Sequence, residues 1–368
     1  MGRSSHEDNH DHQDDLDDNV WESRRKELVL ASKQLPRVES WNEGGICFHQ
    51  GFWFSTKFMP NILCFQQHFQ AHDQDIILAS YPKSGTTWLK SLVFSIVNRK
   101  PYVPSQPSDE KRPKLVGHEV DQQNQVEDTP LLKSSPHGLV PFFEFQVYKD
   151  CMPHKEYLTG GDPIGSPRPR LFATHVPYVS LAESIKSSTC KIVYIARNPL
   201  DVVVSLWHFA QTLPWWSSQW TIEEFAERFC SREFGYGPFL EHLLGFWKES
   251  LERPEKVLFL KYEDMKADDV AQVKRLAEFL GFPFSKEEES GGVIEAIVRL
   301  CSFGNFKGLE VNQPGKYELL DIENSKFFRK GEVGDWANHL GPSIAEHVRK
   351  TIGEKLHDSG LTFEQLKI

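Results

Sequence analysis

The sequence has few cysteines, no long apolar run and no basic excess, and each shortage excludes a class of protein. Its 368 residues hold 6 Cys without a CxxC pair or regular spacing, which disfavours a disulfide scaffold and a zinc ribbon. Residues 1–20 lack the apolar core of a signal peptide and are acidic, unlike transit peptides. The apolar stretch 88–97 is too short to cross a membrane and carries Lys90. We therefore expect a cytoplasmic protein with no membrane partner.

The formal net charge is −10, and residues 1–20 supply more than half of it, with seven acidic side chains against Arg3. An acidic protein lacks the basic face of a nucleic-acid binder, so no nucleic-acid partner is expected. The histidines at positions 6, 10 and 12 could hold a metal with these acids, but a solvated tail is the simpler interpretation, and no metal site is predicted. We expect residues 1–45 to form an acidic, disordered extension with a leading helix, and residues 46–368 to form one domain.

Short buried runs alternate with helical patterns, which is typical of a parallel sheet covered by helices. The expected strands are residues 75–80, 171–176, 190–196 and 257–262, and the expected helices are residues 21–33, 86–97, 199–211, 222–229, 237–251, 270–280 and 343–357. Residues 101–169 are rich in Pro, Ser and charge and exceed ordinary loop lengths, which indicates a lid or a partly mobile segment. The predicted fold class is α/β, a single domain with a central parallel β-sheet flanked by helices.

The clearest chemical signal is YPKSGTTW, Tyr81 to Trp88, between the first expected strand and its helix. Gly85 exposes backbone N–H groups, and the helix N-terminus adds the positive end of its dipole. Thr86 and Thr87 supply hydroxyl donors, while Lys83 supplies a charge for a phosphate. The loop is not a Walker A motif, because the lysine precedes the only glycine. A plain turn with a solvated lysine is the alternative, but the strand–turn–helix context favours a P-loop-like phosphate site.

Side chains that can bind an anion or transfer a proton also follow two other expected strands. Arg197 follows the third strand, with Ser205 on the next helix, and His175 closes the second strand. Ligands of open α/β sheets bind at the carboxyl ends of strands, so these residues are expected near Lys83. His175 is equally compatible with a structural role, and the mid-helix His208 competes with it as a candidate base.

The third segment is FFRKGEVGDW, Phe327 to Trp336, which joins two charges to a flexible glycine. Arg329 and Lys330 suit a phosphate monoester, and an adjacent phenylalanine could stack on a base. A basic surface turn is the alternative for this segment. No G-x-G-x-x-G follows a strand, so a dinucleotide site of that type is disfavoured. The pair Glu263 and Asp264 could hold magnesium, but it could equally cap a helix.

Together, YPKSGTTW, ARNPLDVVVSLWHF and FFRKGEVGDW resemble the cytosolic sulfotransferases, in that order and over residues 46–368. The ATHVPY block and the acidic extension resemble the plant branch. The resemblance implies transfer of a sulfonate from 3′-phosphoadenylyl sulfate (PAPS) to a hydroxyl of a small molecule such as a flavonol, hydroxyjasmonate or steroid, without a metal.

The resemblance also implies roles for individual positions. His175 matches the catalytic base, and Lys83 is placed to stabilise charge on the departing phosphate. The positions that match nucleotide contacts are Lys83, Ser84, Gly85, Thr86, Thr87, Trp88, Arg197, Ser205, Tyr262, Ser302, Phe327, Arg329, Lys330 and Gly331.

Two departures from the family pattern affect expectations. A lysine found in many animal members two residues before the histidine is Ala173 here. Of the short dimer motif only Glu346 is kept, since Ala337 and Gly341-Pro342 replace its other positions. We therefore expect a monomer or a weak homodimer.

The acceptor pocket should be apolar and aromatic. Its candidate residues are Phe52, Trp53, Phe142, Phe143, Trp207, Trp215 and Trp216, although each could instead pack in the core.

Two other functions stay open at this stage. A kinase would need magnesium and ATP, and the missing Walker pattern counts against it. A binding protein without catalysis would keep the pocket and not need His175.

Overall fold

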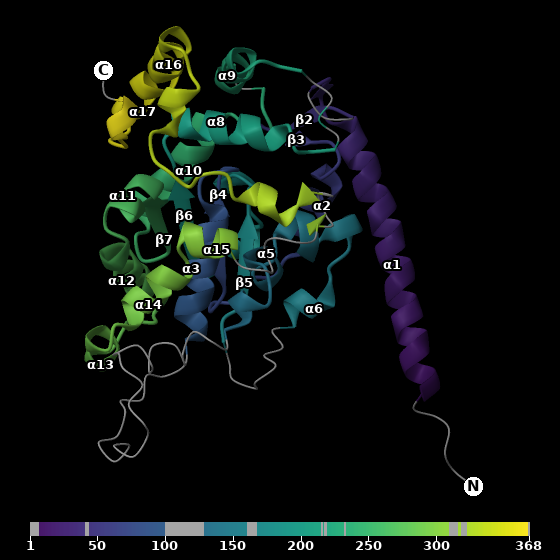
Figure 1. Cartoon of the computed structure of the whole chain (residues 1–368). Coiled ribbons are helices and arrows are strands. Elements are labelled where there is room, and N and C mark those ends of the chain that lie inside the picture. Colours follow the sequence, from purple (N-terminus) through teal and green to yellow (C-terminus); the bar gives the residue numbers. More distant parts are fainter. Residues whose placement is uncertain are drawn as a thin grey trace, which may run out of the picture.

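The computed structural model contains a central parallel sheet with strand order β5-β4-β6-β7 (Figure 1). Its strands are β4 (Ile76–Ser80), β5 (Leu171–Thr174), β6 (Lys191–Ala196) and β7 (Val257–Lys261). The structure describes residues 7–366 except 41–43, 100–128, 160–167, 215, 217–218, 232, 309–315 and 318–321. All four predicted strands are confirmed, each ending within two residues of its expected end. The carboxyl ends of the parallel strands therefore meet at one edge of the sheet.

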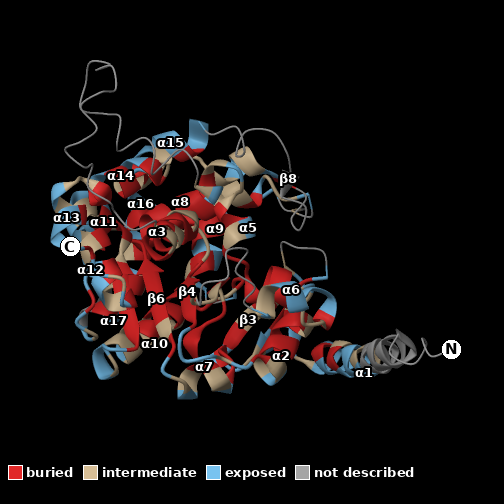
Figure 2. Ribbon diagram, turned by 90° about the horizontal axis from the view of Figure 1, so that it is seen from below, coloured by how far each residue is buried: buried red, intermediate tan, exposed pale blue. Residues whose placement is uncertain are grey.

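Alternating strand residues face two separate apolar cores, so both faces of the sheet are covered (Figure 2). In β4, Ile77 packs in one core, whereas Leu78 packs in the other. The first core contains side chains of α2 (Met59–His68), α8 (Pro199–Ala210), α9 (Ile222–Cys230), α10 (Phe239–Glu252) and α16 (Pro342–Val348). The second contains side chains of α3 (Thr86–Asn98), α12 (Asp269–Leu280) and α14 (Val293–Leu300). This two-sided burial explains why the strands read as continuous apolar runs.

The predicted helices are confirmed, with changes at the N-terminal and C-terminal ends. The expected helix over 343–357 is divided into α16, the π-helical turn η9 (Arg349–Gly353) and α17 (Glu354–His357). The remaining elements that follow β5 in the chain are η5 (Tyr178–Ser180), α7 (Glu183–Ser187), α11 (Tyr262–Ala267), α13 (Lys286–Ser290), α15 (Phe303–Gly308), β8 (Lys316–Tyr317), β9 (Ile322–Glu323), η7 (Asn324–Phe327), η8 (Asp335–Asn338) and η10 (Glu364–Leu366). None of the helices within the described residues is both long and apolar enough to cross a bilayer.

The N-terminal region contains a small antiparallel sheet that the sequence patterns did not predict. It consists of β1 (Arg37–Val38), β2 (Ile46–His49) and β3 (Phe52–Ser55). Before it, α1 (Glu7–Gln34) begins well ahead of the expected residue 21 and extends along the side of the molecule (Figure 1). Its C-terminal half is anchored on α2, where the Trp21 and His68 rings meet edge to face at 4.9 Å. Residues 1–6 and the side chains of residues 7–19 lie outside the described part, so the acidic-tail hypothesis stays a prediction.

The segment 101–169 is only partly described, and its described part is not a loop. It contains η2 (Pro130–Leu132), α5 (Pro136–Leu139), the π-helix η3 (Phe143–Val147), η4 (Lys149–Cys151) and α6 (Lys155–Leu158). Phe143 is fully buried and stacks on Phe65 at 4.3 Å between ring centroids. Aromatic side chains of residues 129–159 help to fill both cores, so this part is packed and not loop-like. Its role as a lid stays a prediction. The rest of the lid hypothesis lies outside the described residues.

Candidate active site

The loop between β4 and α3 has a backbone shape that leaves room for an anion. Lys83 adopts φ 67° and Gly85 adopts φ 111°, both in the left-handed region. A Cβ at Gly85 would lie 2.8 Å from the Tyr262 ring and 3.0 Å from the Ile195 side chain, so only glycine fits without displacement. Gly85 is also the N-cap of α3, which directs the free N–H groups of the first helical turn into the loop.

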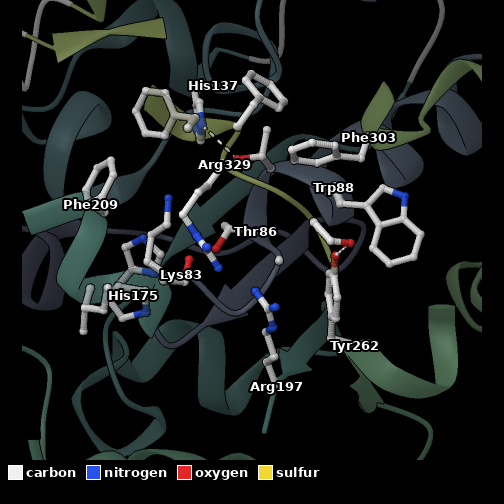
Figure 3. A pocket seen from close by; sticks show the side chains of 18 of the residues that line it. Lys83, Thr86, Trp88, His137, His175, Arg197, Phe209, Tyr262, Phe303 and Arg329 are labelled. Atoms are coloured by element: carbon white, nitrogen blue, oxygen red, sulfur yellow. Dashed lines mark hydrogen bonds between the residues drawn. The ribbon is translucent and has the colours of Figure 1, made fainter. Parts of the chain in front are cut away.

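Three cationic side chains converge on this loop. Figure 3 shows Lys83, Arg197 and Arg329 pointing into the same space from different elements. Burial, and then the charges of the two arginines, lower the pKa of Lys83 to about 7. The buried Nε atoms of both arginines and the buried Oγ of Ser84 have no hydrogen-bond partner within the protein. Unpartnered buried donors are costly, so this cluster is arranged to receive an anionic ligand.

A buried carboxylate holds the C-terminal basic turn in place. Asp335 Oδ2 lies 2.5 Å from Arg329 Nη1, and its Oδ1 lies 2.6 Å from Lys330 Nζ. Behind this turn, Asp201 of α8 accepts hydrogen bonds from the backbone N–H groups of Gly334 and Trp336. These contacts fix the RKG segment against the end of β6, although more than 130 residues separate them. These contacts favour the phosphate-site interpretation over a solvated surface turn, although the Lys330 side chain is 42% exposed.

Aromatic side chains lie beside the cation cluster. The Trp88 and Tyr262 rings meet edge to face at 5.3 Å, and the Tyr262 hydroxyl donates to the Gly331 carbonyl at 2.8 Å. The Arg197 guanidinium lies 4.6 Å above the same tyrosine ring. Phe303 closes over Gly331, where an added Cβ would meet its ring at 2.5 Å. The result is a flat slot beside the anion site, of the kind that accepts a planar ring.

His175 follows β5 and is held in one tautomer. Its Nδ1 lies 2.8 Å from the carbonyl oxygen of Ser80, so Nδ1 carries the proton and Nε2 is a free acceptor. Burial, more than any nearby charge, lowers the pKa of His175 to about 3, which keeps the ring neutral at physiological pH. Glu144 of η3 accepts hydrogen bonds from the His175 backbone N–H and the Thr174 hydroxyl. The histidine is thus an oriented, neutral imidazole at the same sheet edge as Lys83.

Two site residues, His137 and Lys90, were not predicted from the sequence. Lys90 is fully buried on α3, and its Nζ lies 3.3 Å from His137 Nδ1. His137, on α5, places its Nε2 3.2 Å from the Thr87 hydroxyl. Lys90 was considered only as a charge within the apolar stretch 88–97, and His137 fell in the segment interpreted as a lid or partly mobile. A lysine on the apolar side of the helical pattern of α3 was the available signal.

One cavity of about 280 Å³ brings these groups together. Every predicted nucleotide-contact residue lines it except Ser84, which is buried within the loop. Its apolar wall consists of Phe58, Phe142, Phe145, Phe209, Leu213, Trp216, Phe234 and Tyr236. Of the predicted acceptor-pocket residues, Phe142 and Trp216 lie in this wall and Trp215 lies outside the described residues.

The other four aromatic candidates for the acceptor pocket are corrected by the structure. Phe52 and Phe143 are buried in the first core, and Trp53 packs on Phe48 at 5.0 Å between ring centroids. Trp207 donates its indole N–H to the Trp220 carbonyl at 3.1 Å. All four pack against other parts of the protein and do not line the cavity. Composition alone does not distinguish aromatic side chains of the core from those of a pocket.

Two alternatives from the sequence are also resolved by position. His208 does not line the cavity and packs on His339 at 4.9 Å between ring centroids, so it does not share the site of His175. Glu263 accepts hydrogen bonds from the Asn198 backbone and side-chain N–H groups at 2.9 Å. This pair anchors the start of α8, where Asn198 is the N-cap. The capping interpretation of Glu263 is therefore favoured over a magnesium ligand.

Comparison with known proteins connects this geometry to a family. Residues 73–360 match the family described as the sulfotransferase domain. Cytosolic sulfotransferase 15 of Arabidopsis thaliana is 44% identical over 331 residues, covering 89% of this chain and 85% of the relative. Cytosolic sulfotransferase 1 of the same plant is 45% identical over 349 residues, covering 94% and 96%. The chain belongs to the plant cytosolic sulfotransferase family. The resemblance inferred from the three motif blocks is confirmed.

Solved structures agree with this assignment of a sulfotransferase. A candidate steroid sulphotransferase from Arabidopsis thaliana is 37% identical, with a TM-score of 0.65 and coverage of 91% of this chain and 94% of that one. Mouse sulfotransferase SULT7A1, complexed with PAP, is 26% identical with a TM-score of 0.61, and the match covers 85% and 95% of the two chains. The α/β fold around a parallel sheet is thus shared with known sulfotransferases.

Glu144 should make the stability of this sulfotransferase depend on pH. Burial raises the pKa of Glu144 to about 7, despite its hydrogen bonds from His175 and Thr174. The folded state then binds more protons than the unfolded state between the ordinary pKa and 7, so stability falls as pH rises through this window. We expect Glu144→Gln to remove a decline of about 3 kcal/mol between pH 4 and 8. Urea unfolding of both proteins across this range measures the difference, and parallel stability curves would contradict it.

Proposed function

We propose that this sulfotransferase transfers a sulfonate group from PAPS to a hydroxyl of a small-molecule acceptor, with His175 as the general base. The observation that carries the proposal is the tautomer of His175. Its Nδ1 is occupied by the Ser80 carbonyl, and its basic Nε2 belongs to the same cavity as Lys83 and Arg329. A neutral base beside an anion site is what attack of a hydroxyl on a phosphosulfate requires.

The nucleotide end of PAPS fits the residues present. The mouse relative was crystallised with PAP, the 3′,5′-bisphosphate that remains after sulfonate transfer. The β4–α3 loop, residues 83–88, would hold the 5′-phosphosulfate. Arg197, Ser205 and the Arg329-Lys330-Gly331 turn would hold the 3′-phosphate, and the unpartnered guanidinium Nε atoms support this assignment. Trp88, Tyr262, Ser302 and Phe327 would enclose the adenosine.

The chemistry then follows from where protons and charge move. His175 Nε2 takes the proton of the acceptor hydroxyl while the oxygen forms a bond to sulfur. The bond between sulfur and the phosphate oxygen breaks, and negative charge develops on that oxygen. Lys83 and the N–H groups at the start of α3 are preorganised to stabilise this charge. Burial, and then the two arginines, hold the pKa of Lys83 at about 7. The negative charge of the bound anion would raise this pKa towards its ordinary value.

The acceptor would bind against the apolar wall of the cavity. Phe58, Phe142, Phe145, Trp216 and Tyr236 give it a mostly aromatic lining, with His175 on its floor. This lining favours a flat, uncharged molecule with one hydroxyl, such as a flavonol or steroid. The proposal includes action in the cytosol, as the names of the relatives state for them, and a monomer or weak homodimer.

The proposal is tested by incubating the full chain with sulfur-35-labelled PAPS and a panel of hydroxylated plant metabolites. Transfer of label to at least one acceptor without added divalent metal supports it. Magnesium-dependent phosphate transfer from ATP would instead indicate a kinase. Tight PAP binding with no transfer to any acceptor would indicate a binding protein.

Recognition of the 3′-phosphate gives a separate prediction. Lys330→Ala should weaken PAP binding by about 1.5–3 kcal/mol, since a hydrogen bond between charged groups is lost. Binding of 5′-AMP, which lacks the 3′-phosphate, should barely change. Isothermal titration of both ligands measures this. Lys326→Ala, which removes a nearby surface lysine paired with Glu323, is the matched control and should leave both affinities unchanged. Equal losses for PAP and 5′-AMP would place Lys330 elsewhere.

A further inference from the structure

A buried lysine and histidine lie behind the anion loop and have no part in the mechanism above. Lys90 is the fully buried member of the pair, on the side of α3 that faces α5. Its Nζ lies 3.3 Å from the centroid of the Phe142 ring as well as 3.3 Å from His137 Nδ1. Desolvating an amine is expensive, so its retention here calls for a role.

His137, labelled in Figure 3, contacts both Lys90 and Thr87 of the anion site. The ring is held between aromatic groups, stacked on Phe142 and 4.6 Å from the Phe327 ring centroid. Its backbone is also fixed, because its carbonyl accepts from the Gln146 amide at 3.0 Å. Burial lowers the pKa of His137 well below its ordinary value, and the neighbouring charges of Lys90, Lys83 and His175 act in the same direction. A neutral ring must accept at one nitrogen and donate at the other.

Lys90 determines which ring nitrogen of His137 accepts a hydrogen bond and which one donates. A protonated Lys90 ammonium has three N–H donors and no lone pair, so in this state it can only donate to His137 Nδ1. The His137 proton then lies on Nε2 and is donated to the oxygen of Thr87. That oxygen accepts, which leaves the Thr87 O–H proton free to point elsewhere. Thr86 differs, because its hydroxyl already pairs with Ser80 Oγ at 2.6 Å.

We propose that Lys90 and His137 are positioning residues that set the direction of the Thr87 hydroxyl, so that it donates a hydrogen bond to the phosphosulfate. Thr87 is the second residue of α3 and lines the cavity with Lys83. If the hydrogen bond ran the other way, the Thr87 hydroxyl would donate its proton to His137 Nε2. A lone pair of the hydroxyl oxygen would then face the anion. This inference rests on the proposed function, since the anion is the 5′ end of PAPS or PAP.

The first test measures PAP affinity by isothermal titration of the full chain. Lys90→Met and Thr87→Val should each weaken PAP binding about 10-fold, the effect of one hydrogen bond to a charged group. The double variant should lose no more than Thr87→Val alone, because both changes remove the same interaction. Ser95→Ala, on the same helix and also buried, is the matched control and should bind PAP normally. Additive losses in the double variant would overturn the proposal.

The second test does not depend on Lys90→Met folding. His137→Gln keeps an N–H that can reach Thr87 and should retain most of the PAP affinity, whereas His137→Leu should lose about 10-fold. Nitrogen-15 NMR of the ligand-free protein should show His137 protonated at Nε2 and not at Nδ1. Protonation at Nδ1, or wild-type affinity in His137→Leu, would overturn the inference. If the unaltered protein fails to bind PAP, the proposed function fails. The NMR result still tests whether Lys90 sets the tautomer of His137.

Discussion

Replacing His175 with alanine should lower turnover by about 10²–10⁴-fold for an acceptor with a weakly acidic hydroxyl. His175 Nε2 is the proposed acceptor of the hydroxyl proton, and its removal leaves that proton without this acceptor. An acidic phenol, which is already partly ionised, should lose less. PAP affinity should be kept, since the base contacts the acceptor and not the nucleotide. Steady-state kinetics with two acceptors of different acidity, together with PAP titration, measure these three quantities.

His208→Ala is the control for this experiment. His208 lies on α8 outside the cavity, against His339, and its removal should leave turnover near normal. The assignment of the base would be wrong if the roles were reversed, with His175→Ala active and His208→Ala inactive. If neither change affected any acceptor, the interpretation as a binding protein would gain support.

Replacing Lys83 with methionine should lower turnover by about 10²–10³-fold, as expected when a donor that stabilises developing negative charge is lost. Methionine is a similarly long side chain that can still pack on Phe209, whose ring centroid lies 4.1 Å from Lys83 Nζ. The effect should fall mainly on the single-turnover rate constant, because charge on the bridging oxygen is greatest in the transition state. Rapid-quench measurement at saturating PAPS separates this rate from binding.

Lys57→Met is the matched control for Lys83. Lys57 also lies over a phenylalanine ring, that of Phe58, with Nζ 5.5 Å from its centroid, but it does not line the cavity. Its removal should leave the single-turnover rate unchanged. A Lys83→Met protein that lost only PAPS affinity and kept its rate would show that the lysine binds substrate without stabilising the transition state.

The strand framework could be predicted from the sequence because burial on both faces leaves continuous apolar runs. The same property located the strand ends, and hence Lys83, His175 and Arg197, at one edge. The helix over 343–357 was predicted as one element, since π-helical turns such as η9 have no separate apolar pattern.

Other parts of the site depend on contacts that no local pattern records. Glu144 and His137 lie in a segment whose composition suggested a loop, yet they orient groups of β5 and α3. The Asp335 carboxylate that holds Arg329 and Lys330 was hidden in a motif chosen for its cations. Each of these residues acts on a partner from another element, so the three-dimensional arrangement was needed to identify it.

The cavity is assembled from two kinds of structure that can change independently. Lys83, His175 and Arg197 follow strand ends, whose spacing is fixed by the register of the parallel sheet. Arg329 and Lys330 join them from a turn that Asp335 holds in place. Much of its aromatic wall comes from connecting segments and short turns, including Phe58, Phe145, Trp216 and Tyr236. A substitution there reshapes the wall without moving a strand. Gene duplicates of this chain can therefore diversify in the molecules they recognise while inheriting the same reaction chemistry.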